Sequence, residues 1–248
     1  MNPARCHYER GYSMIELSVA LVMALFLLAG ILVILQNTRS ASDSQNGLAQ
    51  LQDDERMAMT LITDVVQQAG YYPDAQTTDP TERFPPSATF ATAGQTIHGA
   101  RNPTAAYGDT ITVRYQGDAS NSVLDCRGAV VADGATEEMT FSVQENPNND
   151  GSWLYCTVNG TSVPLVPHIS SLAIRYGIDS DNSGSVNAYL PADLITAALW
   201  SNVFSVKITV SFTNPLSKQP GQALRTTLPF ARVISVQQKT GYNVLNLF

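Results

Sequence analysis

The chain has 248 residues, of which 44% are hydrophobic and 14% charged, a balance that argues against general disorder and allows one or two domains. With 21 acidic and 14 basic residues its formal charge is −7, which opposes binding to a nucleic-acid backbone. Only three histidines and three cysteines are available for a metal centre or a catalytic triad, so no cofactor is expected from composition.

The N-terminal part of the chain is strongly apolar. Of the 24 residues in 12–35, 20 are apolar, and residues 17–38 carry no charge. At about 1.5 Å per helical residue this stretch is long enough to cross the roughly 30 Å hydrocarbon layer of a membrane. Arg5 and Arg10 outweigh Glu9 before it, so the positive-inside bias predicts a cytoplasmic N-terminus and a single pass. A cleavable secretory signal is the alternative, but its apolar run is usually only 7 to 15 residues long.

One carboxylate interrupts this apolar stretch. Glu16 would cost about 2 to 3 kcal/mol inside a membrane on insertion scales, and it needs a cationic partner there. A cut between Gly11 and Tyr12 would supply one, because the new amino group of Tyr12 would lie about one helical turn from Glu16, in the same chain or in a neighbour.

Gly11 followed by YSMIELSVALVMALFLLAGILVIL resembles the processing site and N-terminal helix of type IV prepilins. The resemblance implies that residues 1–11 are a leader, that a prepilin peptidase cuts after Gly11 and that Tyr12 is then N-methylated. It also implies that Glu16 acts in assembly. Most family members have Phe in place of Tyr12 and Leu or a similar residue in place of Met14, and both differences are conservative in size. A plain membrane anchor with a stray Glu16 is the alternative.

A helical pattern continues beyond the apolar stretch. Leucine, isoleucine, valine and alanine recur at three- and four-residue intervals up to Ala69, and Gly70 supplies a C-terminal stop. The pattern predicts one helix from about Ser13 to Ala69, with residues 12–38 spanning the membrane and 39–70 forming an amphipathic stalk. By resemblance to pilins, the stalk packs on a globular head. The pattern alone also fits a separate core helix.

Residues 71–248 are expected to form a β-rich periplasmic head. Segment 73–108 is rich in proline, threonine and glycine and lacks a period, so it predicts a surface connection with little regular structure. Period-two alternation then predicts antiparallel strands that form one sheet over the stalk helix, and a short helix is expected over Ala192–Trp200. The strands are expected around 111–115, 139–143, 172–178, 204–212 and 224–236. The fold class is α+β, a long N-terminal helix packed on an antiparallel β-sheet head as in type IV pilins.

Cys6 would be lost with the leader, which leaves Cys126 and Cys156 in a part of the chain that faces an oxidising compartment. An even pair there predicts a disulfide. Two buried free thiols are the alternative.

Four stretches of the head resemble the PilW family of minor pilins: LITDVVQQAGYYP at 61–73, DTITVRYQG at 109–117, LYCTVNG at 154–160 and LVPHISSLAIRYGIDSDNSGSVNAYL at 165–190. The resemblance implies a minor pilin of the priming or tip complex of a type IV pilus. Its partners would be other minor and major pilins, the prepilin peptidase, the pilus assembly machinery and, before assembly, membrane lipid. The chain would lie in the bacterial inner membrane with its head in the periplasm, and then in the pilus at the cell surface.

A second candidate site lies in the stretch that begins at Asp179. Asp179, Asp181 and Ser183 occupy the first, third and fifth positions of a calcium-loop pattern, with the carbonyl of Ser185 and the side chain of Asn187 as further donors. The twelfth position is a leucine, so the closing bidentate acid is missing. A turn rich in Asp, Asn and Gly explains the same residues, and calcium is a hypothesis beside it.

Nothing in the sequence indicates an enzyme. After loss of the leader only His98 and His168 remain, and no nucleophile elbow, paired metal motif or phosphate loop is present. Two functions remain open beside a minor pilin. One is a minor pseudopilin of type II secretion, which shares the N-terminal logic, and the other is a tip adhesin that binds a receptor through aromatic side chains. The adhesin candidates are Tyr71, Tyr72, Tyr107 and Trp153.

Overall fold

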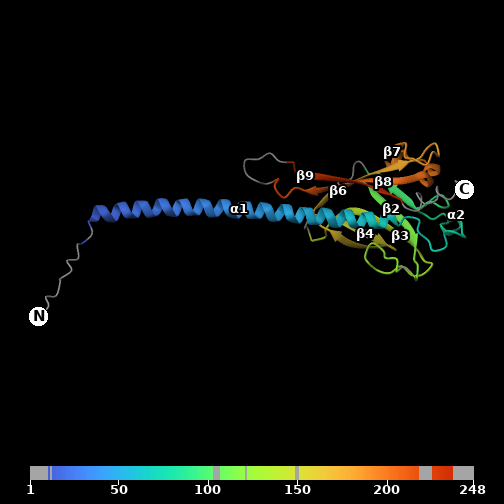
Figure 1. Ribbon diagram of the computed structural model, residues 1–248, viewed down its shortest axis with the longest axis horizontal. Coiled ribbons are helices and arrows are strands. Elements are labelled where there is room, and N and C mark those ends of the chain that lie inside the picture. Colours follow the sequence, from blue (N-terminus) through green and yellow to red (C-terminus); the bar gives the residue numbers. More distant parts are fainter. Residues whose placement is uncertain are drawn as a thin grey trace. The chain divides into compact units, whose positions relative to one another are not determined.

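The computed structural model describes residues 11, 13–102, 107–120, 122–148, 151–217 and 225–236. The chain divides into two compact units, Met1–Leu48 and Ala49–Phe248. Helix α1, Met14–Gln67, contributes to both (Figure 1), and its limits agree with the predicted helix to within two residues. The α+β class expected from the sequence is confirmed, because this long helix is followed by antiparallel sheets.

In the first unit, α1 is apolar and exposed on all sides. Every described side chain from Ser13 to Asp43 is exposed, and these include Met14 at 90% and Phe26 at 77% of their possible surface. Exposure of so much apolar surface to water is unfavourable, so this segment requires a lipid or protein environment.

In the second unit, α1 buries one face. Leu51, Ala58, Ile62 and Val65 recur at helical spacing and are all buried, and each fully buried aliphatic side chain contributes roughly 1.5 to 3 kcal/mol. The helix then ends near Gly70, whose φ of 78° is a left-handed conformation that favours glycine. The Gly70 N–H donates to the carbonyl of Arg114 at 3.0 Å, which ties the end of the helix to the sheet.

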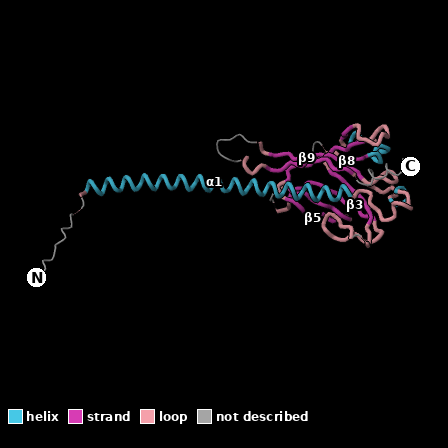
Figure 2. The backbone as a smooth tube through the Cα atoms, in the orientation of Figure 1, coloured by secondary structure: helices cyan, strands magenta, loops and turns pink. Residues whose placement is uncertain are grey.

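The second unit also contains two antiparallel sheets (Figure 2). The first has the order β1-β2-β3-β4-β5, and the second has the order β7-β6-β8-β9. The strands of the first sheet are β1 (Ile97–Ala100), β2 (Thr110–Gln116), β3 (Thr136–Glu145), β4 (Ser152–Val158) and β5 (Thr161–Val166). Those of the second are β6 (Ile169–Ile178), β7 (Ala188–Leu190), β8 (Val203–Thr213) and β9 (Thr227–Ser235).

The expectation of a single sheet was therefore wrong. The first sheet ends at β5, an edge strand that contains Pro164, and proline cannot donate a ladder hydrogen bond. The chain then turns at His168, whose φ is 61°, and enters the second sheet at Ile169. One apolar core contains buried residues of α1 and of both sheets. The buried face of the helix was expected to pack on one sheet, and it packs instead in a core to which two sheets contribute.

Segment 73–108 is more ordered and more buried than expected. It contains the short helix α2, Pro80–Arg83, capped by the side chain of Asp79, and it also contains β1. Phe84 and Phe90 are completely buried. The segment was predicted to lie on the surface because its composition is that of a loop, and residues 73–77 and 85–88 are indeed exposed, but these two isolated aromatic side chains are buried.

The helix expected over Ala192–Trp200 is replaced by two 3₁₀ turns, η1 (Ala192–Leu194) and η2 (Ala197–Asn202). Ile195 and Thr196 lie between them in extended conformations. Both are β-branched, which lowers their helix propensity, and burial of Ile195 rewards the extended form.

Candidate functional site

The candidate assembly site lies at the start of α1. The side chain of Ser13 accepts from the backbone N–H of Ile15 at 3.4 Å, and its carbonyl accepts from the N–H of Leu17 at 3.1 Å. Ser13 therefore caps the helix, and Glu16 lies in the first turn, where a negative charge interacts favourably with the helix dipole. Glu16 is exposed, so its carboxylate is accessible to a partner.

Of the predicted processing residues, Gly11 is described and exposed, while Tyr12 lies outside the described residues. The predicted leader residue Cys6 lies outside them as well. By length and composition, the helix that follows is apolar enough to cross a membrane. A carboxylate in the first turn of such a helix lies at the edge of its apolar segment, where an incoming positive charge can reach it.

The predicted calcium loop folds as a compact turn around one carboxylate. Asp179 is buried, and its two oxygens accept from the backbone N–H groups of Ser183 at 3.1 Å and Gly184 at 2.8 Å. Asp181 also accepts from the Ser183 N–H at 3.2 Å. The Asn187 side chain accepts from the N–H of Ser180 at 2.8 Å. The sequence-predicted oxygen donors thus come together, and backbone N–H groups already occupy several of them.

Hydrogen bonding keeps one acid of this loop ionised. Bonds from Ser183 first, and then interactions with Asp179 and Asn187, lower the pKa of Asp181 to about 2. The side chain of Ser185 bonds to that of Ser183 at 2.9 Å. Within the described residues, no group of three or more His, Cys, Asp or Glu side chains is arranged to hold a metal ion. Calcium binding through Asp179, Asp181, Ser183, Ser185 and Asn187 stays a prediction.

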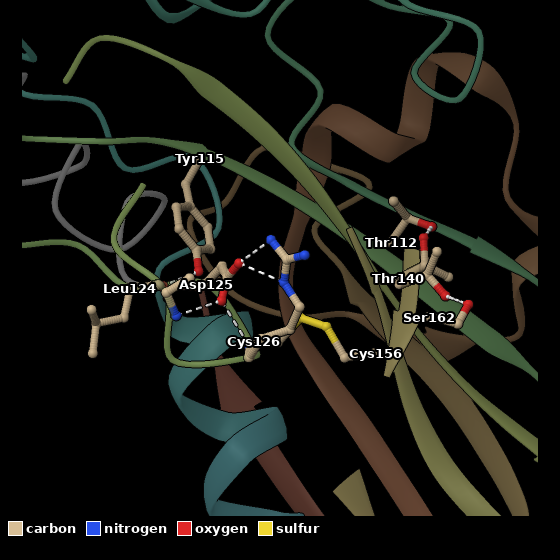
Figure 3. The surroundings of a disulfide bond; sticks show 11 residues. Thr112, Tyr115, Leu124, Asp125, Cys126, Thr140, Cys156 and Ser162 are labelled. Atoms are coloured by element: carbon tan, nitrogen blue, oxygen red, sulfur yellow. Dashed lines mark hydrogen bonds and ion pairs between the residues drawn. A yellow bond between two sulfur atoms is a disulfide. The ribbon is translucent and has the colours of Figure 1, made fainter. Parts of the chain in front are cut away.

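The two head cysteines form a disulfide between the loop that follows β2 and strand β4 (Figure 3). Cys126 and Cys156 have Cα atoms 6.3 Å apart, and both are buried. Beside them, Asp125 accepts two hydrogen bonds from the guanidinium of Arg127, at 2.8 and 2.6 Å. The Tyr115 hydroxyl donates to the carbonyl of Leu124 at 2.5 Å. The disulfide and the hydrogen bond to Leu124 thus hold this loop against the sheet, which is a structural role.

The two histidines of the described chain lie in separate environments. His98 belongs to the segment expected to be a surface connection, but it lies on β1, half-buried between Phe90 and Trp200, whose ring centroids are 6.3 and 5.0 Å away. Burial lowers the pKa of His98. His168 precedes β6 and pairs with Asp54 of α1 at 2.9 Å between Nδ1 and Oδ2. His98 stacks in the core and His168 joins helix to sheet, so neither arrangement resembles a catalytic pair.

The aromatic residues considered for receptor binding serve the fold. The Tyr71 hydroxyl donates to Asp118 at 2.5 Å, and the Tyr72 hydroxyl donates to the carbonyl of Thr78 at 2.9 Å. Tyr107 and Trp153 are half-buried. None of the four therefore projects as a free aromatic anchor of the kind that a receptor-binding surface uses.

Residues 140–241 match the family model of type IV pilus-assembly protein W, named PilW. This match covers less than half of the chain. The resemblance inferred from the sequence motifs is confirmed over these residues, which run from β3 to beyond β9. No curated protein and no solved structure matches the chain significantly.

The similarity to PilW indicates a role in type IV pilus assembly together with other pilus components. PilW proteins are assembly components and not a known enzyme family. The matched region lies wholly in the second unit, while Glu16 and the apolar helix lie in the first.

Proposed function

We propose that this chain is a minor pilin that takes part in the priming or tip complex of a type IV pilus, after cleavage between Gly11 and Tyr12. The observation that carries the proposal is the match of residues 140–241 to PilW. The exposed apolar helix and its single first-turn carboxylate support it, because such a segment is suited to lipid before assembly and to other apolar helices afterwards.

Cleavage would give Glu16 its countercharge. The freed amino group of Tyr12 is a cation, and it would pair with Glu16 of a neighbouring subunit. Between apolar helices in a membrane, packing alone does little to fix the position of one helix along the other. The carboxylate would thus fix the position of one helix against the next. The head would remain on the periplasmic side until extraction, and it would then take its place in the fibre.

The same N-terminal chemistry would serve a pseudopilin of type II secretion, but the family match names pilus assembly. Deletion of the gene separates these functions. We expect loss of surface pili with normal secretion of type II substrates, whereas the reverse result would assign the chain to the secretion system.

Substitution of Glu16 tests the assembly mechanism. We expect Glu16→Gln, which keeps the size of the side chain and removes its charge, to leave cleavage intact but to lower incorporation into the pilus by about tenfold, since an intramembrane ion pair is lost. N-terminal mass spectrometry measures processing, and immunoblotting of sheared pili measures incorporation.

Ser18→Ala is the matched control, because Ser18 lies on the same exposed part of α1 and its hydroxyl donates to the carbonyl of Ile15 in the same helix, at 2.8 Å. Its incorporation should equal that of the wild type. Normal pilus numbers and normal co-purification of partner pilins in Glu16→Gln would contradict the mechanism.

A further inference from the structure

Two like charges lie side by side on the outer face of the second sheet. Arg175 of β6 and Lys207 of β8 are directly opposite each other in the antiparallel register, and both are exposed. Like charges at such positions repel and destabilise the pair of strands. Among the residues that the structure describes, neither forms an ion pair. The sheet thus bears a repulsion that an anion placed between the two side chains would relieve.

These cations line a hollow of about 220 Å³ together with Arg101, Asp109 and the small residues around them. Arg101 is already neutralised, because it pairs with Asp193 at 2.8 Å. The carboxylate of Asp109 accepts from the backbone N–H groups of Asn102 at 3.2 Å and Ile174 at 2.8 Å, so it is committed to the fold. The groups left to meet a ligand are Arg175 and Lys207.

The charges of this hollow select the kind of anion. Arg175 and Lys207 contribute two positive charges, and Asp109 contributes one negative charge to the same space. A singly charged carboxylate matches the remaining charge and suits the planar fork of a guanidinium. A doubly charged phosphate would meet more repulsion from Asp109. The volume also lies below the range of about 300 to 1,000 Å³ that is usual for small-molecule sites, and it admits a single side chain.

The surface next to the hollow is suited to a protein. Val233 of β9 faces Lys207 in the register and leaves 54% of its surface exposed, although it is apolar. Ala173 and Thr209 add small side chains on the same face, which lets a partner approach the sheet closely. We propose that this face, defined by Arg175, Lys207 and Val233, docks a partner protein that presents a glutamate or aspartate beside an apolar side chain. The proposal goes beyond a role in assembly, because it names a surface and its chemistry.

The test uses the full chain in a non-ionic detergent and a labelled hexapeptide of alternating glutamate and valine as the probe. Fluorescence polarisation measures its Kd, and a peptide with glutamine in place of glutamate is the matched probe. We expect the glutamine peptide to bind at least about tenfold more weakly, and the glutamate peptide to weaken as salt is raised.

Variants of the chain locate the binding. We expect the double variant Arg175→Gln, Lys207→Gln to raise the Kd of the glutamate peptide at least about tenfold. The variant Lys207→Glu should abolish binding while keeping or raising the melting temperature, because it makes the cross-strand pair attractive. Arg232→Gln is the control, since Arg232 lies opposite Ile208 on the other face of the same sheet, and binding should not change.

Unchanged binding in the double variant, or equal binding of the two peptides, would overturn the proposal. Competition provides a further test of the anion. If inorganic phosphate or phosphatidylglycerol vesicles displace the peptide at lower concentration than acetate does, the face binds phosphate groups, and the carboxylate assignment is wrong.

Discussion

Arg114 shows at the scale of single residues how a loop-like sequence is held in the core. It is only 2% exposed, and its guanidinium donates to the carbonyls of Gln95 at 2.7 Å, Pro85 at 2.7 Å and Phe84 at 3.1 Å. The same guanidinium lies over the Phe90 ring, with its central carbon 4.3 Å from the ring centroid. Burial lowers the pKa of Arg114. A single cation thus supplies donors to the carbonyls of Gln95 and Pro85 and a second donor to the carbonyl of Phe84, which also accepts from the N–H of Gly94 at 2.8 Å.

Replacement of Arg114 should therefore destabilise the head. We expect Arg114→Met to lower the free energy of unfolding by about 3 kcal/mol, because the carbonyls of Gln95, Pro85 and Phe84 lose a charged donor while the apolar volume is kept. Chemical denaturation of the purified chain in detergent, followed by circular dichroism, measures the change. Arg56→Met, at an exposed position of α1, should change the stability by less than about 0.5 kcal/mol. Equal effects of the two substitutions would refute the argument.

His98 predicts a second effect at this scale, on pH dependence. Burial lowers its pKa in the folded state, so between the unfolded value near 6.5 and that lower value the unfolded chain binds more protons. Stability should be full above about pH 6.5 and should fall as the pH drops through this window. In His98→Gln, the loss of melting temperature between pH 7 and pH 5 should be smaller than in the wild type. His168→Gln retains His98 and should keep that contribution, and an unaltered pH profile in His98→Gln would contradict the prediction.

Among the elements, the loop that follows β2 depends on a covalent link. It carries Asp118, Asp125 and Cys126, and the disulfide to Cys156 joins it to β4 across a sequence separation of 30. Its other ties include the local bond from Arg127 to Asp125 and the hydrogen bond from the Tyr71 hydroxyl to Asp118. An element with few strand pairings of its own gains most from a cross-link, because the link removes freedom from the unfolded chain.

Loss of the disulfide should be costly. We expect Cys126→Ser, Cys156→Ser to lower the free energy of unfolding by about 3 to 4 kcal/mol, the chain-entropy value for a loop of this length. Denaturation of the double variant and of the reduced wild type should give the same loss. If both thiols of the untreated protein can be alkylated without reductant, the link is not formed in solution and the prediction fails.

The elements also show what could be predicted from the sequence. Helix α1 was predicted closely because the spacing of Leu51, Ala58 and Ile62 repeats with the helix period and Gly70 ends it. The alternation in β6 and β8 was equally clear, since one face of each strand is buried. The division into two sheets could not be predicted, because the alternation of a strand tells which face is buried and not which strand lies beside it.

The candidate sites were predictable to different degrees. Glu16 stood out because a charge in an apolar run is rare, and the Asp179 loop did so through its spacing. Arg114 and the pair formed by Arg175 and Lys207 gave no signal, because each appears in the sequence as an ordinary polar position of a strand. The roles of these side chains depend on burial and on the register between strands, which are established only when the chain folds.

At the scale of the whole molecule, the two units require different surroundings. The first presents apolar side chains on every face, whereas the second buries its apolar residues in one core and carries most of the acidic residues on its surface. Such a chain is suited to a boundary between lipid and water. The positive charges before the apolar segment predict which side of the membrane the second unit occupies.

Reporter fusions after Phe248 test this topology. We expect alkaline phosphatase, which needs an oxidising compartment, to be active there, and a fluorescent protein that folds only in the cytoplasm to remain dark. Neutral substitution of both leader arginines, Arg5→Gln with Arg10→Gln, should weaken the preference. Phosphatase that stays inactive on the wild-type chain would place the head in the cytoplasm and exclude the pilin assignment.

The continuity of α1 has a mechanical consequence. The buried face of α1 between Leu51 and Val66 packs in the core, and the N–H of Gly70, just beyond the helix, donates to the carbonyl of Arg114 in β2. A force applied along the helix axis is therefore resisted by many apolar contacts at once, together with the His168–Asp54 pair. These contacts must break together and cannot break one after another. We therefore expect a pulled helix to separate from the head only when its whole buried face slides.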